Sequence, residues 1–323
     1  MAALHWSMQR DRLYKALEEG DAVVVAQFLP QLAKFRTLGP DAIAVILEKA
    51  AACGHEMMIT RLLDLDTSSA SEAEEHALGA LCKAATLGHL GAVLVILDHA
   101  VAASFDGKKL AGPLLHAVEH NKSQGYVDGV RSLLDRGALI ECGSDSALHR
   151  ALREWYFRPR YSYSQEIVHL LIQRANVNWT RADGWSPLYL ACRGGASASD
   201  VPRVNAPVTF ARALIQRGAL VDTPTSLGVT PLHAAIMYMR TDRAQLLLQS
   251  GADILPLLRR ISDNRGLYYR RGGPSPDMVA LLRPRVEAAL RDMILEEGRG
   301  WRYIGELAFL VPRICEFYFG PCL

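Results

Sequence analysis

Apolar residues recur along this chain in short runs that have the spacing of amphipathic helices, and the runs come in pairs. Around Leu13, Leu47 and Leu81 the sequence reads LYKALEEGD, LEKAAACGH and LCKAATLGH, and these leucines lie 34 residues apart. A second apolar pair follows about half a period later, as at Leu62 and Leu63. A fixed period of this length is typical of proteins in which each repeat is one supersecondary unit. The pattern therefore predicts two short amphipathic helices in every repeat.

The leading leucine of the repeat can be followed through most of the chain. Its predicted positions are Leu13, Leu47, Leu81, Leu115, Leu148, Leu188, Leu232 and Leu267. The step lengthens to 40 residues before Leu188 and to 44 residues before Leu232. Longer steps in a repeat array correspond to insertions, so we place two insertions between paired helices, near residues 155–164 and 196–207.

The later repeats share short motifs whose residues suit the ends of helices. GVTPLHAAIM contains Thr230 and DGWSPLYLA contains Ser186, each directly before a proline. A hydroxyl at the N-cap accepts a backbone N–H, and proline fits the first helical position because no donor is needed there. The second helices end in QRGA and QSGA, where Gly218 and Gly251 can adopt the left-handed conformation that ends a helix.

These motifs and their period resemble the ankyrin repeat over roughly residues 13–283. The resemblance implies an all-α solenoid, with an ankyrin-repeat array at residues 1–283 and a C-terminal helical cap at residues 284–323. About seven repeats and a degenerate capping repeat are expected from the period. The repeats have to stack because one repeat alone leaves its apolar face in water, and burial contributes about 25 cal/mol per Å² of apolar area.

The composition is that of a folded protein without a dominant charge. The chain has 323 residues, 50% of them hydrophobic, and a formal net charge of +2, which argues against disorder and against a partner chosen by charge alone. Its six cysteines are scattered without a CxxC pair, which indicates reduced thiols. The first residues lack the pattern of a signal peptide, and no apolar run suits a membrane span. We therefore expect a monomeric cytoplasmic or nuclear protein.

The resemblance implies a partner-binding surface formed by the fingers between helix pairs and by the exposed side of the first helices. The first insertion is aromatic and cationic, a mixture enriched at recognition surfaces, and an exposed tryptophan is a natural anchor. The candidate residues are Trp155, Tyr156 and Arg158 in this insertion, Trp179, Arg181, Asp183 and Trp185 in the finger between the fifth and sixth repeats, and Tyr189 and Arg193 behind them. The alternative is structural: the insertion packs back on its neighbour, and Trp185 covers the next finger. We predict a non-catalytic scaffold or adaptor that binds a protein partner.

Two other classes of function remain open. Residues 256–285 contain seven arginines and two acidic residues, with Tyr268 and Tyr269 interleaved, which suits nucleic acid or another acidic ligand. A solvated capping repeat would have a similar composition, since terminal repeats need a polar outer face. The third possibility is an enzyme or a metabolite-binding protein, with its site in the insertions or under the apolar tail at residues 298–323.

One motif has the spacing of a metal site. His116, Glu119 and His120 spell H-x-x-E-H, which places two potential ligands one helical turn apart, as in some zinc peptidases. We interpret His116 as the histidine of the repeat motif, which is seen again at His149 and His233, and no third ligand is evident. The sequence therefore favours a protein with no metal, no cofactor and no catalytic residue.

Overall fold

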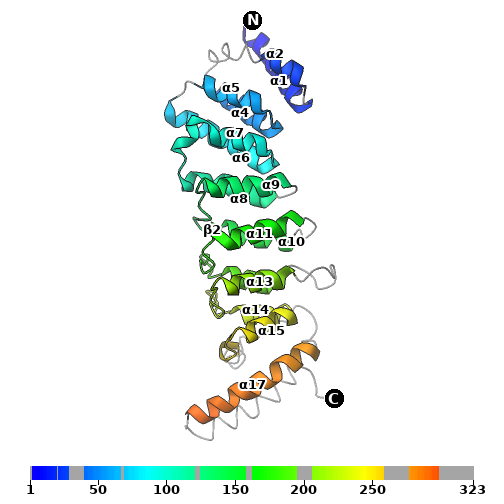
Figure 1. Ribbon diagram of the computed structural model, residues 1–323, viewed down its shortest axis with the longest axis vertical. Helices are drawn as coiled ribbons and strands as arrows, with labels where there is room; N and C mark the ends of the chain where they lie inside the picture. Colours follow the sequence, from blue (N-terminus) through cyan, green and yellow to red (C-terminus); the bar gives the residue numbers. More distant parts are fainter. Residues whose placement is uncertain are drawn as a thin grey trace. The chain divides into compact units, whose positions relative to one another are not determined.

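The computed structural model describes residues 2–19, 21–28, 40–66, 69–120, 124–157, 162–194, 206–257 and 276–297. The chain divides into two compact units, Met1–Arg174 and Ala175–Leu323. Almost all regular structure in both units is helical (Figure 1). None of the helices in the described ranges combines the length and the hydropathy needed to cross a membrane.

The first unit consists of helix pairs that follow one another along the chain. The pairs are α1 (Ala2–Glu19) with α2 (Ala22–Phe28), α4 (Pro40–Cys53) with α5 (Glu56–Leu65), α6 (Ala70–Leu87) with α7 (Leu90–Asp98), α8 (Gly107–His120) with α9 (Gln124–Asp135), and α10 (Ala147–Phe157) with α11 (Ser162–Arg174). A 3-10 helix, η3 (Ala100–Ser104), follows α7. The first helices stack on one another in the order α1, α4, α6, α8, α10, and the second helices stack as α5, α7, α9, α11 (Figure 1).

A short hairpin joins the last two pairs of the first unit. Its strands are β1 (Glu141–Cys142) and β2 (Asp145–Ser146), which are antiparallel with Glu141 opposite Ser146. The hairpin is a finger of the kind that the repeat motif predicts between pairs.

The second unit continues the same design with shorter helices. Its pairs are α12 (Pro187–Arg193) with α13 (Ala206–Gln216) and α14 (Pro231–Met237) with α15 (Thr241–Gln249), followed by α17 (Pro276–Glu297). α12 packs on α14, α13 on α15, and α15 contacts α17. The boundary predicted between residues 283 and 284 lies inside α17. The tail at residues 298–323 lies outside the described residues.

The leading leucines form the core of the stacked helices. Six of the predicted positions have 0% exposure, namely Leu13, Leu47, Leu81, Leu148, Leu188 and Leu232. The predicted Leu115 is wrong, because the buried residue of α8 is Leu114, with 0% exposure, whereas Leu115 is only partly buried. Leu114 directly follows Pro113, just as the core leucines of α12 and α14 directly follow a proline. Leu267 lies outside the described residues.

The predicted helix caps are confirmed in the second unit. The Ser186 hydroxyl accepts a hydrogen bond from the backbone N–H of Tyr189 at 3.1 Å. The Thr230 hydroxyl accepts one from the N–H of His233 at 3.4 Å, and the His233 ring in turn accepts one from the N–H of Thr230 at 3.2 Å. Gly218 and Gly251 have φ angles of +84° and +86°, as expected for glycines that end the second helices.

Side chains at the start of the second helices hold consecutive repeats together. Each donates a hydrogen bond to a backbone carbonyl near the end of the preceding repeat's first helix, because a carbonyl oxygen can only accept. The bonds are His55 Nε2 to Leu17 O at 3.0 Å, His89 Nε2 to Ala52 O at 2.9 Å, Tyr126 Oη to Thr86 O at 3.0 Å and Arg243 Nη1 to Ala191 O at 3.1 Å. Carbonyls at a helix C-terminus have no partner within the helix, so these bonds satisfy groups that would otherwise need water.

The predicted insertions differ in how much of them is described. Most of residues 155–164 belongs to α10 and α11, which have 11 and 13 residues, against 7 and 9 in α14 and α15. The first insertion therefore lengthens a helix pair more than it forms a loop. Most of the second insertion, residues 196–205, lies outside the described residues.

Candidate functional site

The finger that precedes α12, residues 176–186, carries four of the predicted partner-binding residues. Gly184, with φ of +77°, closes a tight turn in which its N–H donates to the carbonyl of Arg181 at 2.8 Å. A Cβ atom at Gly184 would lie 2.6 Å from the backbone nitrogen of Ser226, whose N–H donates to the carbonyl of Asp183 at 3.0 Å. The finger is therefore held against the next finger by backbone contacts that require glycine.

Trp185 lies at the base of this finger and is partly buried. Its ring centroid is 5.2 Å from that of Tyr189, with 48° between the ring planes. Together with Met237, it packs on the buried cluster of Tyr189, Val229 and Ala234. Since Val229 belongs to the next finger, Trp185 does cover that finger, as the structural alternative predicted, and it keeps part of its surface exposed.

Arg193, the last residue of α12, lies close to two aromatic rings. Its guanidinium carbon lies 4.8 Å from the ring centroid of Trp185 and 5.2 Å from that of Tyr238, and its Nε donates to the Tyr238 hydroxyl at 2.9 Å. Arg181 adds a second guanidinium 5.7 Å from the Trp185 ring. Such cation–π contacts contribute about 0.5–1 kcal/mol each where they are exposed. We name these four residues, Arg181, Trp185, Arg193 and Tyr238, the Arg193 stack.

Tyr238 is the member of the Arg193 stack that sequence reasoning missed. It is the C-cap residue of α14, the position that Gly194 occupies after α12. An alignment of the two repeats could have found it, because a bulky residue at that position faces the end of the preceding first helix.

The other predicted residues have varied environments. Asp183 accepts a hydrogen bond from the Trp185 N–H at 3.1 Å and lies 3.6 Å from Arg181 Nε, so it stabilises the finger. Trp179 is partly exposed, and its N–H donates to Asn176 O at 3.1 Å. Trp155 is only 9% exposed and belongs to the core, so it offers little surface to a partner. The side chain of Tyr156 and all of Arg158 lie outside the described residues.

An open groove lies between the second helices α13 and α15. It has a volume of about 500 Å³, and its lining includes Arg212 and Asp242. The groove is open to solvent rather than closed. This shape does not provide the deep pocket with convergent polar groups that an enzyme or metabolite site requires.

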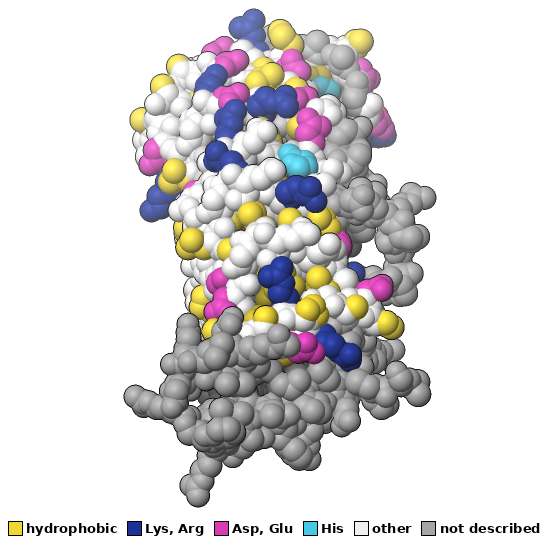
Figure 2. Space-filling view, turned by 60° about the horizontal axis from the view of Figure 1, so that its bottom comes forward, with side chains coloured by type: hydrophobic (Ala, Val, Ile, Leu, Met, Phe, Trp, Pro, Cys, Tyr) yellow, Lys and Arg dark blue, Asp and Glu magenta, His cyan; other side chains and the backbone are white. Residues whose placement is uncertain are grey.

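The Arg-rich segment is described only at its ends. Of its seven arginines, Arg283 and Arg285 lie on α17 and are exposed, and the remaining five are outside the described residues. On the face shown in Figure 2, basic and acidic side chains of the described residues lie next to one another rather than in separate regions. That face therefore does not show the single-sign surface typical of nucleic-acid binding.

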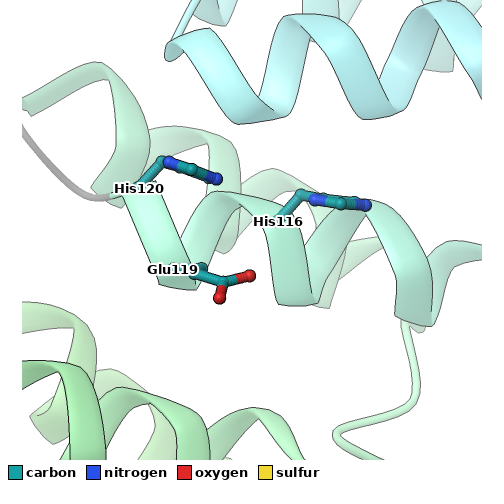
Figure 3. A group of neighbouring side chains, drawn as sticks. All are labelled: His116, Glu119 and His120. Carbon is teal, nitrogen blue, oxygen red and sulfur yellow. The ribbon is translucent and has the colours of Figure 1, made fainter.

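His116, Glu119 and His120 come together on α8. Their ligand atoms all lie within 4.8 Å of one another, and Figure 3 shows the two imidazole rings on the same side of the helix. The Glu119 carboxylate also accepts a hydrogen bond from Arg150 Nη1 at 3.1 Å. Burial lowers the pKa of His116, the neighbouring Glu119 carboxylate raises it to a smaller extent, and nearby cationic groups lower it further.

The interpretation of His116 as the repeat histidine is wrong. His149 and His233 occupy that position, with 1% and 0% exposure, and their rings lie 2.8 Å from the Ser146 hydroxyl and 2.6 Å from the Thr230 hydroxyl. In α8 the equivalent position is Leu115, one residue earlier than His116. His116 is consequently exposed and has no part in capping the helix.

Comparison with known proteins agrees with this architecture. Residues 160–256 match the family model described as ankyrin repeats (3 copies). Neurogenic locus notch homolog protein 1 of Homo sapiens and that of Mus musculus are each 33% identical over 94 residues, which is 28% of this chain and 4% of the length of those relatives.

Two solved ankyrin repeat domains are similar in structure. The human ASB11 ankyrin repeat domain has a TM-score of 0.50 at 22% identity, covering 73% of this chain and 96% of that chain. The ankyrin repeat domain of Bcl-3 has a TM-score of 0.49 at 24% identity, covering 68% of this chain and 97% of that chain. Stacked helix pairs joined by fingers define a helical repeat solenoid. Within that class, residues 160–256 are matched as ankyrin repeats, and the fold of the chain is similar to that of a solved ankyrin repeat domain.

Proposed function

We propose that this protein is a non-catalytic scaffold or adaptor that binds a protein partner at the Arg193 stack. Ankyrin repeats are generally protein–protein interaction domains, which supports the class of function. The location is supported by residue type, because tryptophan, tyrosine and arginine are the residues most enriched among binding hot spots. The observation that carries the proposal is the position of the Arg193 guanidinium over the rings of both Trp185 and Tyr238.

The Arg193 stack is preorganised for binding. Two aromatic rings and the hydrogen bond from Nε to Tyr238 restrict the Arg193 side chain before a partner arrives. Ordering a flexible side chain at an interface costs about 0.5–1.5 kcal/mol of binding free energy, and a side chain that is already ordered avoids part of this cost. In the described contacts, the hydrogen bond from Arg193 to Tyr238 is donated by Nε. The terminal Nη groups can therefore donate hydrogen bonds to a carboxylate or carbonyl oxygen of the partner.

The proposal is tested by quantitative affinity capture from cells that produce the protein. A partner bound at the Arg193 stack should be recovered at less than about a tenth of its wild-type level by the Trp185→Ala, Arg193→Ala variant, since an anchor of this kind contributes more than about 1.4 kcal/mol. Arg212→Ala, in the groove between α13 and α15, serves as the matched control for loss of a surface arginine. Full recovery of every partner by the folded double variant contradicts the proposed location.

Trp179 is tested separately, because it lies on the same finger but is not one of the four residues of the Arg193 stack. If Trp179 is a second anchor, Trp179→Ala lowers recovery of the same partner and leaves other proteins unaffected. We also propose a monomer in the cytoplasm or nucleus. Light scattering of the purified protein and imaging of the endogenous protein check these two points.

A further inference from the structure

We propose that His116, Glu119 and His120 on α8 bind a divalent transition-metal cation, with Zn²⁺ as the ion that the donor set fits best. Two imidazoles and one carboxylate are ligands that Zn²⁺ accepts in proteins, usually with a water in the remaining position. The sequence favoured no metal for two reasons: His116 had a structural interpretation, and a third ligand was missing. The structure removes both reasons. His116 does not occupy the position of the repeat histidine, and the Glu119 carboxylate lies close enough to both rings to be the third ligand.

The geometry of the three side chains suits a single ion. Residues four apart on a helix lie on the same face one turn apart, and the rings of His116 and His120 extend from the same side of α8 (Figure 3). Zn–N and Zn–O bonds are about 2.0–2.2 Å, so two ligand atoms of one ion lie about 3.3–4 Å apart. In the structure the ligand atoms lie within 4.8 Å of one another, so small side-chain rotations would bring them into that range.

The two histidines are available to a ligand. His116 is exposed and His120 partly so, and neither ring has a hydrogen-bond partner among the described residues. By contrast, the repeat histidines His149 and His233 are buried and bonded to hydroxyls.

Glu119 supplies the third ligand and is oriented by Arg150. Its Oε2 accepts the hydrogen bond from Arg150 Nη1, which fixes the carboxylate and leaves Oε1 to coordinate an ion. Partners that orient a ligating carboxylate in this way are common around metal sites. Lys83 and Arg150 are cations near His116, so they oppose a bound cation and keep the affinity below that of a structural zinc site.

The experiment is a calorimetric titration of the full chain with ZnCl₂ in the presence of a phosphine reductant. We expect one site with a dissociation constant on the order of 10 µM, which three protein ligands and two opposing cations make reasonable. His116→Ala and His120→Ala should each weaken binding by more than about tenfold. Glu119→Gln should weaken it by a smaller factor because the amide oxygen is a poorer ligand.

His169→Ala is the matched control, since it removes a partly buried histidine of α11 that lies outside the cluster. It should leave the affinity unchanged. Both ligand histidines are at the surface, so circular dichroism should show the same helix content in every variant. Unchanged Zn²⁺ affinity in either His116→Ala or His120→Ala overturns the proposal, and so does wild-type binding that is weaker than about 1 mM.

Discussion

Gly88, directly after α6, shows how closely single residues are specified at a junction between repeats. Its φ angle is +75°, a region that side chains with a Cβ rarely adopt. A Cβ atom there would lie 2.4 Å from the Tyr126 ring, whose hydroxyl donates to Thr86 O. Backbone conformation and packing therefore both require glycine.

Gly88→Ala should lower the free energy of unfolding by about 3 kcal/mol, the sum of a left-handed backbone penalty and a steric clash. Urea denaturation followed by circular dichroism measures this difference. Gly112→Ala is the control, because it lies inside α8 and a Cβ there meets nothing within 4 Å. That substitution should be neutral or slightly stabilising, since alanine is the better helix former. If both variants lowered the free energy of unfolding by the same amount, the loss could not be attributed to the junction between repeats.

Cys192 is another residue whose surroundings determine its chemistry. It is fully buried in α12, and burial raises its pKa to about 12. The thiolate is the reactive form, and a group with this pKa is almost entirely protonated at pH 8. Burial raises the pKa of Cys82 as well, to about 11.

We therefore expect iodoacetamide at pH 8 to leave Cys192 unmodified in the folded protein and to modify it fully in urea. Mass spectrometry of the digested protein measures the extent of modification at each cysteine. Cys142 is partly exposed and provides the internal comparison. Rapid modification of Cys192 without denaturant would mean that α12 opens readily.

At the scale of elements, the N-caps determine where the short first helices begin. α14 has only 7 residues, and an isolated helix of this length is not stable in water. Thr230 caps it, and the buried ring of His233 completes the reciprocal pair of hydrogen bonds. Ser146 caps α10 in a similar way: its hydroxyl accepts a hydrogen bond from the N–H of His149 at 3.3 Å and lies 2.8 Å from the His149 ring, while the Ser146 N–H donates to the Asp145 carboxylate.

Thr230→Ala should lower the free energy of unfolding by about 1–2 kcal/mol, because it removes the cap and leaves the buried His233 ring without its hydroxyl partner. Thr230→Ser keeps the hydroxyl and should cost less than half as much. The comparison requires only equilibrium unfolding of the two variants. A serine variant as unstable as the alanine variant would indicate that the threonine methyl group, rather than the cap, carries the effect.

Across the whole first unit, each helix pair contacts mainly the pairs on either side of it. α6 packs on α4 and α8, whereas α1 and α10 are each one repeat further away. In a solenoid of this kind, stability is close to a sum of repeat terms and nearest-neighbour interface terms. Local destabilisation should therefore fade with distance along the stack.

Leu81→Ala creates a cavity at a fully buried position of α6 and should lower the free energy of unfolding by about 2–5 kcal/mol. Hydrogen exchange measured by mass spectrometry should accelerate most in α6, less in α4 and α8, and least in α1 and α10. A uniform increase across these helices would instead mean that the first unit unfolds as one cooperative block.

The sequence by itself determined the period, the paired helices, the caps and the terminating glycines. These features depend on interactions between residues three or four apart, such as Thr230 with His233, or on the backbone preference of a single glycine, such as Gly218 and Gly251. Local interactions of this kind leave a direct signature in the order of residues. They were therefore predicted, and the structure confirms them.

Tertiary structure decided which of two adjacent leucines enters the core and which side chains meet across repeats. Leu114 and Leu115 both satisfy an apolar pattern, and the packing of α8 against its neighbours buries the first of them, which follows a proline as do the core leucines of α12 and α14. That shift by one residue exposes His116 and separates it from the repeat histidines. Arg193 likewise meets Tyr238 from the next repeat, 45 positions along the chain. Contacts between distant segments depend on how whole helices stack, which no local pattern of residues encodes.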